Sequence, residues 1–132
     1  MNTPEVTRAR ISALSSIVHD LSVSYRDAFG LARVVGEVVA LSFPGCPNEL
    51  IGCAIRYSNA ARHAEATRAA WNATNGAGSH LAHGLRELAI YAERSADEMC
   101  AEFVRRMESH YTAPMPPADC DPVTGQEYGT GA

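Results

Sequence analysis

The sequence predicts an all-α protein, an antiparallel bundle of two or three long helices with a flexible C-terminal tail. Apolar residues recur at steps of three and four over long stretches, which is the spacing of one face of a helix. Two short segments rich in Pro, Gly and Asn interrupt this pattern, and strand-like alternation of useful length is absent. Because both connections are short, successive helices should run antiparallel.

The first helix is expected at about residues 4–42. Thr3 can cap its start, and Pro4 suits its first turn. An unbroken helix of this length would measure about 57 Å. Gly30 and Gly36 could kink it, since each costs roughly 1 kcal/mol relative to alanine. Its apolar residues form one heptad stripe: Ile11, Leu14, Val18, Leu21, Tyr25, Ala28, Ala32, Val35 and Val39.

The second helix is expected at 47–74, after a turn at Pro44 and Gly45. The middle of this helix carries Ala60, Ala61 and Ala64, which would let a neighbouring helix approach to about 8 Å. Its inner stripe contains Leu50, Ala54, Tyr57, Ala61, Ala64 and Trp71.

The third helix is expected at 79–111. Asn75 and Gly76 form the strongest turn signal in the chain, and Ser79 can cap the helix that follows. This helix is amphipathic, because the side opposite its apolar stripe is densely charged. Its inner stripe is predicted to be Leu81, Leu85, Leu88, Ala92, Met99, Phe103 and Met107.

Two regions follow from this pattern. Residues 1–112 should form one helical bundle domain. Residues 113–132 are rich in Pro and Gly and cannot form a packed core, so they are predicted to be a disordered tail.

The four cysteines match no zinc-binding spacing. They are expected to be small apolar fillers plus one exposed thiol, although one disulfide could form if the protein is exported.

Composition excludes several classes of function. The chain has 11 basic and 15 acidic residues and a net charge of −4, and its arginines are scattered among acids, so nucleic-acid binding is not expected. No apolar run approaches the roughly 18 residues that a membrane helix needs. A secretory signal peptide is not recognisable, so the location is expected to be cytoplasmic, or outside the cell by a route without a cleaved signal.

One group of residues resembles a metal site. His80, His83 and Glu87 are spaced so that two imidazoles and a carboxylate share one helix face. A metal ion usually needs a further ligand, which would come from another helix, with His19, His63 and Glu65 as the obvious sources. The alternative is that these histidines are solvated side chains near a helix start.

Motifs of nucleophilic or phosphate chemistry are missing, so the chain is not expected to be an enzyme and no cofactor is predicted. Trp71 either plugs the open end of the bundle or anchors a partner. Tyr57 and Tyr91 are expected on or beside inner faces, and Tyr91 is also a candidate contact residue. Val35 and Val39 are further candidates, because a straight first helix would extend roughly 15 Å past the second and leave its stripe uncovered.

Part of the chain, roughly residues 55–105, resembles the WxG-type substrates of type VII (ESX) secretion systems, especially the EspC-like group. The resemblance is carried by Trp71, the Gly76 to Gly78 turn, and Leu81, Ala82, Leu85, Arg86, Leu88, Ala89 and Tyr91. It implies a secreted helical hairpin, often a dimer, in which a Trp near the turn pairs with a Tyr-x-x-x-Asp/Glu export signal.

The chain departs from that pattern in two places. Trp71 is followed by Asn72 and Ala73, so the tight Trp-x-Gly is absent. Ser95 stands four residues after Tyr91, where the export signal has an acid, with Asp97 and Glu98 two and three positions later.

These observations predict a non-enzymatic protein–protein interaction module. It is expected to form a homo-oligomer or to bind a helical partner, and the resemblance adds type VII-like secretion. The alternative is a helical bundle that binds a small ligand or metal through His80, His83 and Glu87.

Overall fold

The computed structural model describes residues 3–74 and 78–112, and within these ranges the elements are helices without strands. In chain order they are α1 (Pro4–Ser24), α2 (Ala28–Ser42), α3 (Asn48–Asn72) and α4 (His80–Thr112). The all-α class is therefore confirmed. The predicted turn residues Asn75 and Gly76 and the predicted tail 113–132 lie outside the described residues.

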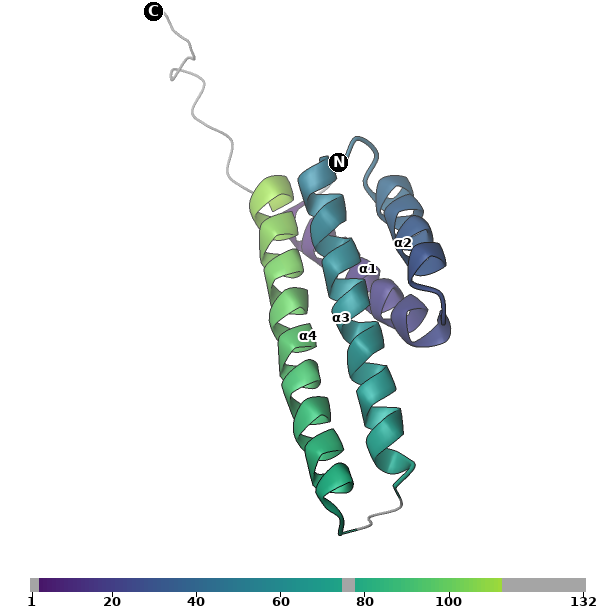
Figure 1. Ribbon diagram of the computed structural model, residues 1–132. Coiled ribbons are helices and arrows are strands. Elements are labelled where there is room, and N and C mark those ends of the chain that lie inside the picture. The colour runs from purple at the N-terminus through teal and green to yellow at the C-terminus, as the bar shows by residue number, and fades with distance from the viewer. Residues whose placement is uncertain (1–2, 75–77, 113–132) are drawn as a thin grey trace, which may run out of the picture.

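The longest helices, α3 and α4, form an antiparallel hairpin, and the shorter α1 and α2 pack against its upper part (Figure 1). α1 contacts both helices of the hairpin, whereas α2 packs on α3 and α1. The last turns of α3 and the first turns of α4 extend beyond α1 and α2 in Figure 1. One part of the hairpin is thus covered by other helices, and the other part has only itself to pack against.

The expectation of a single helix over 4–42 is wrong, because the helix stops at Ser24 and a new one starts at Ala28. The carboxylate of Asp27 accepts hydrogen bonds from the backbone N–H of Phe29 at 3.3 Å and of Gly30 at 2.9 Å. This is the N-cap of α2. Gly30 and Gly36 lie inside α2 and do not break it.

Two serine hydroxyls in the last turn of α1 help to end the helix. Ser22 and Ser24 donate to the carbonyl oxygens one turn earlier, at 2.6 and 2.8 Å. Such bonds compete with regular helix geometry and often bend helices. Because the heptad spacing runs across the break, the apolar pattern alone could not reveal it.

The break turns α2 back against the rest of the chain. Leu31, Val35 and Val39 are fully buried there, whereas Tyr25 and Ala28 of the predicted stripe are exposed. The predicted stripe is therefore divided between α1 and α2. Neither helix extends past the bundle as an uncovered continuation of the other.

The other predicted helix boundaries agree closely with the structure. Gly45 has a φ of 78° in the turn between α2 and α3, a conformation that favours glycine. The hydroxyl of Thr3 accepts from the N–H of Val6 at 3.2 Å, and that of Ser79 accepts from the N–H of Ala82 at 3.1 Å. Both hydroxyls are the predicted caps.

The main core lies where all four helices meet. Phe103 is fully buried there, and its ring stacks on Tyr57 with centroids 6.4 Å apart. Burial at Tyr57 confirms its predicted place on an inner face. The apolar residues of this core include Ile11, Leu14, Val18, Leu31, Val35, Val39, Phe43, Leu50, Ala54, Tyr57, Phe103 and Met107.

The predicted inner stripe of α4 is only partly confirmed. Ala92, Phe103 and Met107 are buried as expected, but Leu81, Leu88 and Met99 are 69%, 54% and 38% exposed. In the first half of the helix, Ala82, Ala89 and Ala96 join Ala92 on the inner face. The expectation that Leu81 and Leu88 face inward is therefore wrong.

Alanines on both helices explain this register. Ala64 packs with Ala92 and Ala96 in a separate cluster, and Ala60 adjoins it. Small side chains allow two helices to approach closely, and a leucine at any of these positions would push them apart. The hairpin end therefore packs alanine against alanine and leaves Leu81 and Leu88 outside.

A polar clamp accompanies this alanine seam. The guanidinium of Arg68 on α3 binds both carboxylate oxygens of Glu93 on α4, at 2.7 and 2.5 Å. The same guanidinium lies 4.7 Å from the centroid of the Trp71 ring. Arginine thus links the two helices and covers the tryptophan near the end of α3.

Candidate interaction surface

The outer side of α4 carries an apolar face that no other described helix covers. We define the α4 outer face as Leu81, Gly84, Leu88, Tyr91 and Ser95, which follow one another at the alternating heptad steps of three and four residues. Tyr91 is 72% exposed, and Leu81 and Leu88 are exposed as well. Single exposed apolar residues are ordinary, but three on one face of one helix are typical of a binding surface.

Charged residues line one edge of this face. Glu87 and Arg94 are both exposed and stand seven positions apart, so they lie on the same edge. A hollow of about 100 Å³ beside Tyr91 is lined by Tyr91, Arg94, Ser95 and Glu98. The α4 outer face thus combines an apolar centre with a border that carries Glu87, Arg94 and Glu98.

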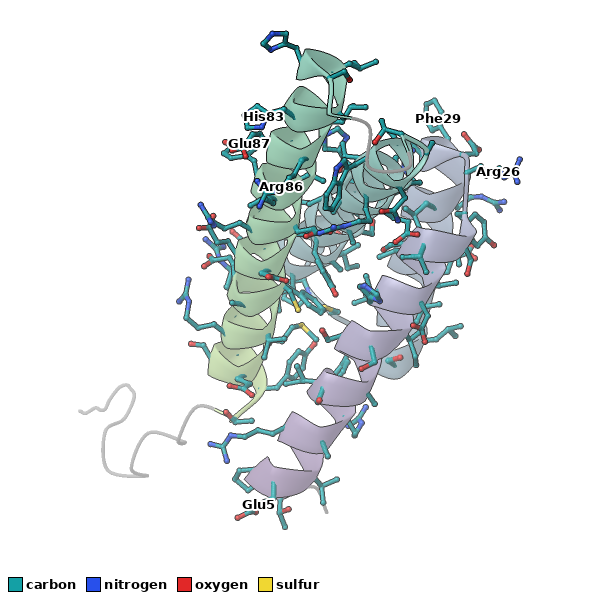
Figure 2. The ribbon with its side chains drawn as sticks, turned by 90° about the horizontal axis from the view of Figure 1, so that it is seen from below. Glu5, Arg26, Phe29, His83, Arg86 and Glu87 are labelled. Carbon is teal, nitrogen blue, oxygen red and sulfur yellow. The ribbon has the colours of Figure 1, made fainter. Side chains whose placement is uncertain are left out.

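The three predicted metal ligands lie on the same helix. Figure 2 shows His83 and Glu87 beside Arg86, directed away from the other helices. His80, His83 and Glu87 are all exposed. Among residues 3–74 and 78–112, no three His, Cys, Asp or Glu side chains gather closely enough to hold a metal ion. The geometry adds no ligand from a second helix, and the metal site stays a prediction.

The four predicted contact residues fall into different environments. Val35 and Val39 are fully buried against the chain's own core, so the expectation that they form an uncovered stripe is wrong. The physical reason is the break before Asp27, which folds α2 back. Tyr91 is exposed rather than at an inner face, and Trp71 is half-buried under Arg68. Tyr91 shares an exposed face of α4 with Leu81 and Leu88, which were expected inside.

A cavity of about 190 Å³ lies between α1, α3 and α4. Its acidic groups are Glu65, Glu93 and Asp97, and Glu93 is already bound to Arg68. Tyr57 also lines this cavity, and burial raises its pKa well above the ordinary range, to which the neighbouring Cys100 thiol adds. A phenol held protonated in this way is a poor general base.

The cysteines of the described residues are all free. Cys46 and Cys53 are buried, and Cys100 is half-buried with its sulfur 3.3 Å from the Ser15 hydroxyl oxygen. Burial raises the pKa of the Cys46 thiol, which a hydrogen bond with Tyr111 partly offsets. A raised pKa disfavours the nucleophilic thiolate, which agrees with the filler role predicted for the buried cysteines. Cys120 lies outside the described residues.

In the part of the chain that the structure describes, no helix has the length and apolar character needed to span a membrane. Comparison of the chain with protein-family models, with characterised proteins and with solved structures finds no match.

Proposed function

We propose that this chain is a non-enzymatic helical interaction module that self-associates through the α4 outer face. The observation that carries the proposal is the exposure of Leu81, Leu88 and Tyr91 on one face, while alanines fill the seam with α3. Larger side chains would not fit in that seam without pushing the helices apart. Leu81, Leu88 and Tyr91 lie outside it and expose apolar surface to water. A second helix laid along the face would remove that surface from water.

The proposal predicts that the full chain forms a dimer and that Leu88→Glu converts it to a monomer. A carboxylate at the centre of an apolar contact loses its hydration without gaining a partner. The measurement is sedimentation equilibrium over a range of protein concentrations, with helix content checked by circular dichroism.

Leu41→Glu is the matched control, because Leu41 is 81% exposed on α2, away from the α4 outer face. This variant should keep the mass of the unmodified chain. A wild-type chain that stays monomeric at all concentrations would contradict the proposal, as would equal effects of the two substitutions.

The α3–α4 hairpin also supports the proposal of type VII-like secretion. Trp71 lies in the last turn of α3, and Tyr91 is exposed on α4, where an export receptor could contact it. Expressed in a bacterium with an active type VII system, the chain should reach the medium, and Tyr91→Ala should retain it in the cell. The Leu41→Glu variant should be exported normally, and equal retention of both variants would contradict this role of Tyr91.

A further inference from the structure

We infer that the partner on the α4 outer face is a second copy of this chain whose α4 runs antiparallel, with Glu87 of each copy paired to Arg94 of the other. The inference rests on the proposed self-association and adds its orientation and register. It follows from the order of apolar, small and charged residues along α4.

The four central residues of the α4 outer face match one another in the antiparallel direction, whereas Leu81 at its end falls opposite Glu98. When Leu88 of one copy lies opposite Tyr91 of the other, symmetry repeats the same contact a turn away. Gly84 then lies opposite Ser95 on both sides of this centre, so the two small residues allow the helices to stay close. Large residues meet large ones at the middle, and small ones meet at the flanks.

The charges at the edge match in the same register. Glu87 immediately precedes Leu88, and Arg94 follows Tyr91 by three positions, so both occupy the same heptad edge. In an antiparallel pair this edge meets the same edge of the second helix, and Glu87 of each copy faces Arg94 of the other. The symmetric contact therefore contains two complementary ion pairs.

A parallel arrangement lacks this complementarity. There, each edge residue faces the position five residues later in the second helix, so Glu87 would face Ala92 and Arg94 would face Met99. Neither of those residues can form an ion pair. Charged edge residues set the orientation of helix pairs, and here they favour the antiparallel one.

The α4 outer face is also accessible in the described chain. α1 contacts α4 at Cys100, where the Ser15 hydroxyl meets the thiol, and α2 packs on α3 and α1. Glu87 and Arg94 are exposed, and Figure 2 shows Glu87 directed away from the bundle. A second α4 can therefore lie along this helix without displacing an element of the fold.

Charge reversal at the two positions tests the register. Glu87→Arg alone should place two like-charged contacts in the dimer and raise its Kd about tenfold, and Arg94→Glu alone should do the same. An equimolar mixture of the two single variants should associate about as tightly as the unmodified chain. In the mixed dimer every facing pair is again of opposite charge. High salt should reduce these differences because the charges are at the rim.

Sedimentation equilibrium of each variant and of the mixture provides the readout, with circular dichroism to confirm that the helices are kept. The matched control pair is Arg33→Glu and Glu37→Arg, both exposed on α2. Each of these should dimerise like the unmodified chain, alone and mixed. A mixture of the α4 variants that associates no better than the single variants would overturn the antiparallel register.

The two proposals fail differently. If the unmodified chain is monomeric, self-association itself is refuted. If the unmodified chain dimerises and Leu88→Glu disrupts the dimer, but the mixture shows no recovery, self-association stands and the inferred register is refuted.

Discussion

Replacing Phe103 with alanine should lower the free energy of unfolding by about 3–5 kcal/mol. The Phe103 side chain is fully buried where the four helices meet, and its ring stacks on Tyr57. Truncation removes the buried ring and leaves a cavity that the close-packed neighbours cannot fill completely. Urea denaturation at fixed protein concentration, followed by circular dichroism, measures the loss.

Met99→Ala is the control for this prediction, because Met99 lies one turn earlier on α4 and is 38% exposed. Its loss should be well below that of Phe103→Ala. Equal losses would mean that the burial pattern described for α4 is incorrect.

The second large effect is expected in the alanine seam of the hairpin. Ala92→Leu should destabilise the chain by about 1–3 kcal/mol, because the larger side chain must displace α3 or adopt a strained rotamer. Ala92 is almost fully buried and packs in the same cluster as Ala64. The substitution adds buried apolar volume. It would stabilise the chain if the seam were loosely packed, and it should destabilise a seam that is already closely packed.

Ala101→Leu supplies the comparison, since Ala101 is exposed on the same helix. This variant should change the free energy of unfolding by about 0.5 kcal/mol or less. An Ala92→Leu variant as stable as the unmodified chain would argue against close α3–α4 contact at this point.

Local capping chemistry was the part of the fold that the sequence predicted best. The hydroxyls of Thr3 and Ser79 cap helices as expected, and Gly45 takes the conformation that the turn requires. These signals are readable because each depends on a few adjacent residues. Asp27 is an equally good cap. The heptad stripe continues across it, however, and indicates one unbroken helix.

The candidate surface was harder to predict because it depends on which face of α4 meets α3. Leucines at heptad spacing normally mark the buried side, and here they mark the exposed one. A usable signal was present: Ala82, Ala89 and Ala96 are spaced by seven residues, like Ala54 and Ala61 on the facing helix. Matching small residues across two helices would have placed Leu81 and Leu88 outside.

The alanine seam also makes the stability of the chain uneven. An alanine buries a single methyl group, worth about 0.8 kcal/mol, so the end of the hairpin is held by little more than this seam and the Arg68–Glu93 pair. That end can open while the base around Phe103 remains folded, since local opening needs far less energy than global unfolding. A partner that binds the outer side of α4 would therefore also stiffen the hairpin, and part of its binding energy would be spent on that ordering.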